Sequence, residues 1–341
     1  MLQVATENTQ LVDKLRAEEL ASDATVKRVR VSITAAASAL AYHVVSMIAS
    51  RQVFGNPVKV TLNLCDANVS ASSALATEAV DLASLSVHEP PAVTSDLNQY
   101  FTGADVILLL DDVTVGEGEP RADWLRRVYS KFSSYAHEID AVCSRDVVIV
   151  VPAINSAANF IGSVISRCAP NIPASNIIVT SRLVENGARA AISRQSGVNS
   201  GSIVDLVVWG DASAVNTSRF AVDVSHAKVY DCDSSAVWGP EYFRSVESVV
   251  RDTRWLSHDL PSLVVSSSTS SSSSRAVIAT ASALTSFLSD WCMLGRCKCN
   301  RSRLHSVAVA SQGHVIPSDN TVQQRCIYTL NHKNVPLCFR L

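Results

Sequence analysis

Residues 29–41 read VRVSITAAASALA and open the first strand–turn–helix unit of the chain. Residues 29–33 have the pattern of a buried strand, and residues 39–50 have the apolar spacing of a helix. Further strands are predicted at residues 58–64, 104–110, 146–151, 177–181 and 204–209, and further helices at 124–141, 186–196 and 276–291. Residues 307–310 and 326–330 are predicted as a closing antiparallel pair. Apolar strands that alternate with helices indicate an α/β fold with a mostly parallel, doubly wound sheet.

The composition limits the classes of protein to which this chain can belong. Its 341 residues are 47% hydrophobic and 18% charged, which is typical of a globular protein with a substantial core, built as one large domain or two lobes. The net charge of −2 argues against a general nucleic-acid binder, and no apolar run reaches membrane-spanning length. The first residues show no signal-peptide core, so the nine cysteines are expected to be reduced thiols in the cytosol.

Three segments lie outside this alternation. Residues 9–21 are predicted as a helix with an apolar stripe, packed on the surface of a lobe or placed in a groove of a partner. Residues 266–274 are eight Ser and one Thr, which predicts a loop or a frayed helix start. A basic stretch is either a solvated loop or a contact with an acidic protein surface or RNA; it comprises Arg296, Lys298, Arg301 and Arg303. The nearby Cys292, Cys297, Cys299 and Cys326 fit a zinc site poorly in spacing, so no metal is expected.

The turn after the first strand departs from the pattern that its position predicts. In a dinucleotide-binding βαβ unit this turn reads G-x-x-G-x-x-G or G-x-x-G-x-x-A, because glycines let the backbone turn tightly and approach the pyrophosphate. Here the first two glycine positions hold Ala35 and Ser38, and the third holds Ala41. The frame of an oxidoreductase is present, but the atoms that would touch a cofactor are changed, so no cofactor is expected.

Several short stretches carry a specific resemblance. They are VFG at 53–55, TGADV at 102–106, EG at 117–118, APNIP at 169–173, SRL at 181–183, VWG at 208–210, SHAKV at 225–229 and RWL at 254–256. The chain resembles the malate/lactate dehydrogenase family, and within it the cytosolic malate dehydrogenase group. The resemblance implies an N-terminal extension (1–28), a degenerate Rossmann domain (29–155) and a degenerate α+β substrate lobe (156–341). The family's C-terminal helix has no counterpart before the chain ends at Leu341.

The resemblance also implies which residues would bind the cofactor. Asp66 matches the acidic residue that binds the adenosine ribose hydroxyls; alternatively it caps a loop. Asp111 stands where the family has a neutral Gly near the phosphates. Two like charges ~4 Å apart repel by about 4 kcal/mol at an effective dielectric near 20, so Asp111 is expected to oppose binding unless it is a solvated loop residue turned away from the site.

The substrate and proton-transfer positions are altered in the same way. Val115 stands where the first substrate arginine belongs, whereas Arg121 and Arg182 match the second and third, and Asn159 matches the asparagine that holds the substrate oxygen. Val cannot form the planar bidentate pair that Arg gives a carboxylate.

The catalytic pair of the family is missing. Val184 replaces the aspartate that orients the catalytic histidine, and Glu185, one residue later, is expected to point elsewhere. Ala212 replaces the histidine itself. Loss of general acid–base help costs roughly 100- to 10,000-fold in rate.

These residues predict a catalytically inactive malate dehydrogenase-like protein that is retained for its shape. The expected role is a structural subunit or surface module of a larger cytoplasmic assembly, and the resemblance points first to the flagellar or ciliary axoneme. Expected partners are proteins, as a homodimer or paired with an active paralogue, with no specific nucleic acid and no membrane. The alternatives are an oxidoreductase with altered substrate or cofactor, and a regulatory partner of an active malate dehydrogenase.

Overall fold

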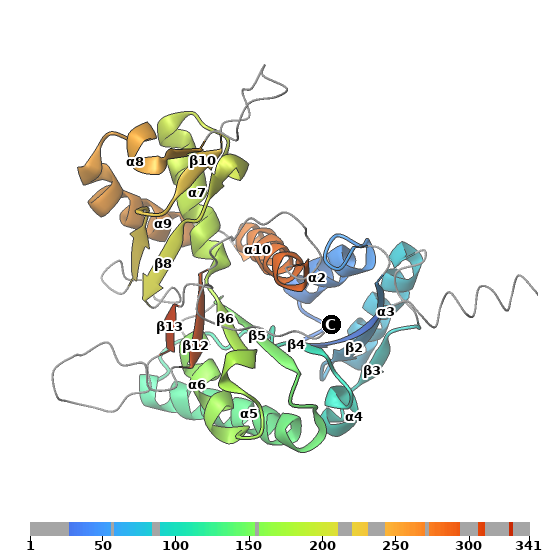
Figure 1. Ribbon diagram of the computed structural model, residues 1–341. Coiled ribbons are helices and arrows are strands. Elements are labelled where there is room, and N and C mark those ends of the chain that lie inside the picture. Colours follow the sequence, from blue (N-terminus) through green and yellow to red (C-terminus); the bar gives the residue numbers. More distant parts are fainter. Residues whose placement is uncertain are drawn as a thin grey trace, which may run out of the picture.

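The computed structural model describes residues 27–55, 58–83, 89–153, 157–210, 220–230, 243–269, 273–293, 306–310 and 327–329. Its main sheet has eight strands in the order β13-β12-β6-β5-β4-β1-β2-β3 (Figure 1). Six strands run parallel: β1 (Arg28–Thr34), β2 (Lys59–Cys65), β3 (Ala92–Thr94), β4 (Val106–Leu108), β5 (Val148–Pro152) and β6 (Ile177–Thr180). Their order, 3-2-1-4-5-6, is that of a doubly wound sheet, which confirms the predicted fold class.

Two antiparallel strands extend this sheet beyond β6. Val307–Ala310 forms β12, which pairs with β6, and Ile327–Thr329 forms β13, which pairs with β12. The predicted closing pair is therefore confirmed. It joins the main sheet, so this sheet draws strands from both sides of the expected domain boundary at residue 155, and that boundary stays a prediction.

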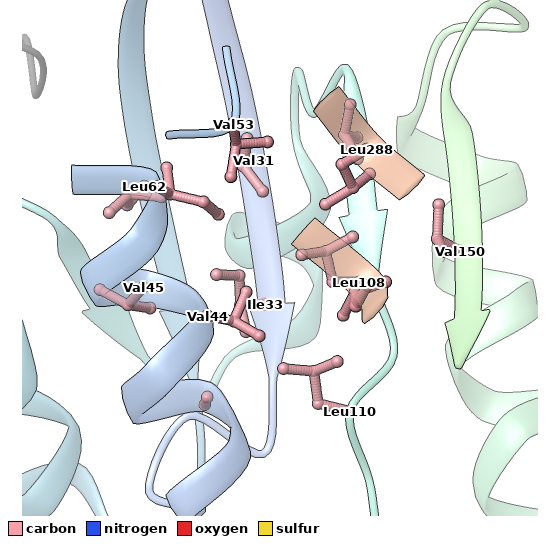
Figure 2. Packing of buried hydrophobic residues seen from close by; sticks show 14 of the residues in the cluster. Val31, Ile33, Val44, Val45, Val53, Leu62, Leu108, Leu110, Val150 and Leu288 are labelled. Atoms are coloured by element: carbon pink, nitrogen blue, oxygen red, sulfur yellow. The ribbon is translucent and has the colours of Figure 1, made fainter. Parts of the chain in front are cut away.

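Helices cover both faces of the main sheet. One face packs against α2 (Ala39–Ala49), α3 (Val69–Ala83) and α10 (Ser273–Met293), and the other against α4 (Leu97–Phe101), α5 (Arg121–Val142) and α6 (Ala158–Cys168). Figure 2 shows the first layer, in which Val31 and Ile33 of β1 meet side chains of α2 and Leu288 of α10. A strand buried on both faces must be apolar at successive positions, which explains the continuous apolar runs of β4 and β5.

The remaining elements form a second lobe, drawn at the upper left of Figure 1. They are α7 (Arg182–Ser196), β7 (Ile203–Val204), β8 (Val207–Gly210), β9 (Phe220–Asp223), β10 (Lys228–Tyr230), β11 (Phe243–Ser245), α8 (Val246–Val249) and α9 (Leu260–Thr269). β7, β10 and β11 form one small sheet, and β8 pairs with β9. A separate apolar cluster built on Ile192, Leu206, Val208 and Leu260 holds this lobe together.

Two predicted elements need correction. The predicted strand at residues 204–209 is two strands, because Asp205 adopts a left-handed backbone conformation (φ 58°) that interrupts β7 and β8. The serine tract is helical where it is described, since α9 ends at Thr269 and α10 begins at Ser273.

Some predicted segments cannot be compared with the structure. The helix at 9–21, the basic stretch at 296–303 and the C-terminal residues 330–341 lie outside the described residues. Within the described part of the chain, none of the helices has the length and hydropathy needed to cross a bilayer.

Candidate functional site

The loops after β1 and β4 leave the main sheet toward opposite faces. β1 leads into α2 on one face, β4 leads into α5 on the other, and the two strands are neighbours in the sheet. Doubly wound sheets bind their ligands at such a switch point, outside the carboxyl ends of the strands. The candidate site is therefore built by the turn after β1 together with the residues that follow β2 and β4.

The turn after β1 keeps the backbone geometry of a glycine turn without the glycine. Ala35 has φ 50°, in the left-handed region that an L side chain disfavours. The next three backbone N–H groups donate within the chain: Ala36 to the Cys65 carbonyl (3.1 Å), Ala37 to Asp66 Oδ2 (3.0 Å) and Ser38 to the Ala35 carbonyl (2.9 Å). Three successive backbone donors of this turn therefore already have acceptors within the chain.

Ser38 has a structural task at the start of α2. It is the N-cap of this helix, and its Oγ accepts a hydrogen bond from the Ala41 N–H at 3.1 Å. Its φ of −78° is one that any residue adopts, so the second glycine position no longer needs glycine.

Asp66 follows β2, and its carboxylate is hydrogen-bonded to the turn after β1. One carboxylate oxygen accepts from the Ala37 N–H, and the other accepts from the Asn68 N–H at 2.8 Å. The residue matched to ribose binding is thus a loop cap that also ties β2 to the turn, which agrees with the alternative role considered for it.

Asp111 follows β4 and lies buried at the switch point, with 5% of its surface exposed. It accepts hydrogen bonds from Thr34 Oγ1 (2.5 Å) and the Tyr135 hydroxyl (3.3 Å), and Lys131 Nζ lies 2.5 Å from its Oδ1. Asp111 is therefore not a solvated loop residue. The sequence predicted that the Asp111 charge would repel the phosphates of a cofactor. That prediction needs correction, because Asp111 forms an ion pair with Lys131 that offsets its charge.

Sequence reasoning missed the partners of Asp111. Lys131 and Tyr135 are four residues apart on α5 and so share one face of that helix. Burial and the nearby Asp111 carboxylate raise the pKa of the Tyr135 hydroxyl far above its usual value. Burial, with smaller contributions from Asp111 and Asp66, raises the pKa of the Cys65 thiol to about 11. Both groups therefore stay protonated near neutral pH beside the ion pair.

The loop between β4 and α5 is tied down at several points. Trp124 Nε1 donates to the Val113 carbonyl at 2.5 Å, and Arg127 bonds both Glu119 and the Thr114 carbonyl. Hydrogen bonds from the Arg127 side chain lower the pKa of Glu119. Val115 is 48% exposed in this loop, and Arg121 is the exposed first residue of α5. Both of these expected substrate positions are therefore exposed to solvent.

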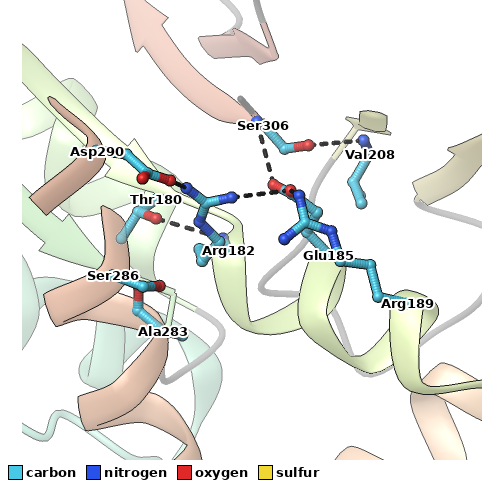
Figure 3. Close-up of polar contacts among 9 residues, drawn as sticks. All are labelled: Thr180, Arg182, Glu185, Arg189, Val208, Ala283, Ser286, Asp290 and Ser306. Carbon is cyan, nitrogen blue, oxygen red and sulfur yellow. Dashed lines mark hydrogen bonds and ion pairs between the residues drawn. The ribbon is translucent and has the colours of Figure 1, made fainter. Parts of the chain in front are cut away.

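Arg182 is enclosed by carboxylates of the chain itself (Figure 3). Its Nη1 lies 3.0 Å from Glu185 Oε1, and its Nη2 pairs with Asp290 of α10. The side chain is 3% exposed and that of Glu185 is fully buried. The resemblance predicts an arginine that binds a substrate carboxylate, and that role stays a prediction; in this structure its guanidinium pairs with two carboxylates of the chain itself.

Glu185 also holds neighbouring elements together. It pairs with Arg189 one turn further along α7 and accepts from the Ser306 N–H beside β12 at 3.4 Å, while Ser306 Oγ accepts from the Val208 N–H at 2.9 Å (Figure 3). The sequence prediction that Glu185 points elsewhere than the orienting aspartate of the family stays a prediction.

Two of the remaining predicted positions lie on different helices, Val184 on α7 and Asn159 on α6. Val184 packs against the apolar cluster of the second lobe, and Asn159 is the half-buried second residue of α6. Ala212 lies outside the described residues, so its position stays a prediction from the sequence. Among the described residues, no group of three or more His, Cys, Asp or Glu could hold a metal ion.

The geometry does not fit the dinucleotide that the fold implies. A pyrophosphate needs free backbone donors at the turn and an open switch point. Here three consecutive donors are taken, Asp66 accepts from the turn, and Thr34 is bonded to Asp111 across the ends of β1 and β4.

Comparison with known proteins identifies homologues of this chain. No family model matches it. It is 29% identical over 319 residues to "Putative malate dehydrogenase 1B" of Branchiostoma floridae, covering 92% of this chain and 59% of that protein. It is 31% identical to the protein of the same name from Bos taurus, covering 76% and 54%, and 29% identical to "Malate dehydrogenase, cytoplasmic" of Gallus gallus, covering 68% and 65%. The chain thus spans little more than half the length of the first two relatives.

Solved structures share the fold at low sequence identity. A malate dehydrogenase from Naegleria fowleri superposes with a TM-score of 0.67 at 23% identity, covering 84% of this chain and 82% of that one. A lactate dehydrogenase from Trichomonas vaginalis, solved with NADH and oxamate, gives 0.70 at 19% identity, covering 89% and 86%. Taken together, these comparisons show that this chain is similar in sequence to proteins named malate dehydrogenase and shares the fold of malate and lactate dehydrogenases.

Proposed function

We propose that this chain is a catalytically inactive member of the family that acts as a structural or scaffolding component of a larger protein assembly. One observation carries the proposal: the backbone N–H groups of Ala36, Ala37 and Ser38 already donate to acceptors within the chain. Each would have to break an existing hydrogen bond before it could bind a phosphate. Net exchange of one hydrogen bond for another gains little free energy, so these three donors contribute little to binding of a cofactor.

The sequence supports the same proposal at the reaction centre. Ala212 and Val184 stand at the positions that resemble the family's histidine and aspartate, and Val115 stands at the first substrate arginine. An alanine has no group that exchanges a proton near neutral pH. The proposal therefore extends to the chemical step as well as to cofactor binding.

A role in the flagellar or ciliary axoneme is the most specific form of the proposal. It rests on the resemblance alone. Enrichment of the tagged chain in purified axonemes would support it, whereas its recovery only in complex with an active malate dehydrogenase would favour the regulatory alternative.

The enzymatic part is tested with the purified chain, oxaloacetate and NADH, beside an active malate dehydrogenase as positive control. We expect no turnover, and calorimetry with NAD⁺ and NADH should show no binding in the micromolar range. Restoring histidine alone with Ala212→His should not create activity. Turnover near 1 s⁻¹, within the usual range for enzymes, would contradict the proposal and favour an oxidoreductase with altered chemistry.

A further inference from the structure

The switch point of the main sheet contains a buried anion that belongs to the chain. Asp111 lies after β4, next to Thr34 at the end of β1, and its carboxylate has polar contacts on several sides. Thr34 Oγ1 donates to Oδ2 and accepts from the Leu110 N–H at 3.0 Å, so it connects the ends of the two strands directly. The carboxylate therefore fills the position at which sheets of this type receive a ligand.

Lys131 makes burial of this carboxylate possible. An isolated buried carboxylate is strongly unfavourable, whereas one with a paired cation and hydrogen-bond donors is tolerated. Lys131 supplies the cation, and Thr34 and Tyr135 supply hydroxyl donors. Only 4% of the Asp111 side chain is exposed, against 41% of Lys131, so the cation can be reached from solvent while the anion cannot.

We infer that Asp111 is a resident substitute for a ligand anion, and that Lys131, Thr34 and Tyr135 form the oxyanion-binding group that it occupies. This inference rests on the proposed function, and it identifies the Asp111 carboxylate as the group that occupies the switch point. Removal of the carboxylate should leave a cation and two hydroxyl donors with no anion between them. Such a group suits a small oxyanion, with inorganic phosphate as the probe.

The test is thermal unfolding of Asp111→Ala with added phosphate, at ionic strength matched with chloride. We expect the variant to unfold at a lower temperature than the parent chain. Phosphate at ~10 times its Kd should then raise the midpoint of the variant by roughly 2 °C, and that of the parent by less than 1 °C. The matched control is Asp112→Ala, because Asp112 is the exposed neighbour and should show the parent's response.

A second variant tests whether the rise in unfolding temperature with phosphate depends on Lys131. Asp111→Ala combined with Lys131→Met removes both charges, so it should fold without any phosphate-specific rise. If Asp111→Ala folds and phosphate does no more than chloride, the inference is wrong. It is equally wrong if the double variant keeps the full phosphate response.

The affinity of Asp111→Ala for ADP distinguishes a failure of this inference from a failure of the proposed function. Because the turn donors stay occupied, ADP should bind Asp111→Ala no more tightly than phosphate does. Binding of ADP more than 10-fold tighter would support the resident anion and count against the closed turn on which the proposed function depends. Micromolar NADH binding by the parent chain would contradict both.

Discussion

Ala35 shows at the scale of one residue how the turn was altered. Its φ of 50° is the conformation that a glycine adopts at little cost, and the chain holds an alanine in it. Hydrogen bonds from the N–H groups of Ala36, Ala37 and Ser38 fix the backbone on the following residues. The loss of glycine therefore changed the residue type more than the path of the chain.

Ala35→Gly is expected to stabilise the protein. A left-handed conformation costs an L residue roughly 1–2 kcal/mol, and the greater freedom of glycine in the unfolded chain offsets about 0.5–1 kcal/mol of the relief. A net gain of about 0.5–1 kcal/mol should appear as a higher urea midpoint. The matched control is Ala37→Gly, two residues along in the same turn, which should lower the midpoint. A lower midpoint for Ala35→Gly would show that its backbone is not strained.

Cys65 should make stability depend on pH in the alkaline range. Burial raises the pKa of this thiol to about 11 in the folded protein, from an ordinary value of 9.0. The unfolded chain therefore loses its thiol proton first, so the contribution of Cys65 is fully present below pH 9 and is lost as the pH rises toward 11. Cys65→Ser should reduce the fall in stability between pH 9 and 11, measured by denaturant unfolding. An unchanged slope would mean that the thiol is more solvated than the structure indicates.

At the scale of elements, an ion network connects three segments that are distant in sequence. Arg182 and Glu185 begin α7, Asp290 lies near the end of α10, and Ser306 precedes β12 (Figure 3). These segments meet where the chain passes between the main sheet and the second lobe. The network therefore fixes how the second lobe is attached.

Glu185→Gln should destabilise the protein by about 3 kcal/mol. The substitution leaves Arg182 and Arg189 without their shared carboxylate in a buried setting, and loss of one partner of a buried pair typically costs about 3–5 kcal/mol. The control is Glu247→Gln, an exposed glutamate in the first turn of α8, which should change stability by less than about 0.5 kcal/mol. Equal shifts for both variants in denaturant unfolding would argue against the network.

The sequence predicted most of these elements but not their side-chain partners. Apolar periodicity was enough for β1, α2 and α5, because each contributes a continuous apolar face to one core. It could not predict that Asp290 reaches Arg182 across 108 residues, or that Lys131 reaches Asp111, because such pairs depend on how separate elements are placed. Asp66 was identified by its position after β2, yet its role as a cap depends on the donors of the turn.

At the scale of the whole molecule, the proposed assembly needs surfaces by which the chain is held. The sequence offers the predicted helix at residues 9–21, the basic stretch at 296–303 and the residues after the closing strands. All three lie outside the described residues, so their part in an interface is a prediction.

Two variants test that prediction in the native assembly. Deletion of residues 1–24, or charge reversal at Arg296, Lys298, Arg301 and Arg303, should release the chain from its assembly without changing its thermal midpoint. The basic contact should also weaken at high salt, because salt screens exposed charges. If both variants remain bound in pull-down experiments, attachment runs through other surfaces.

The place of α10 over α2 has a consequence for synthesis of the protein. Thr285 Oγ1 lies 3.4 Å from Met47 Sδ, although 238 residues separate them in sequence. At a ribosomal rate of about 5–20 residues per second, α10 is synthesised roughly 12–48 s after α2. The apolar surface of α2 that α10 covers in the folded protein is exposed during that time. During that interval the nascent chain presents an unfinished hydrophobic layer. Chaperones that bind exposed apolar surfaces should therefore be engaged with this protein until α10 emerges.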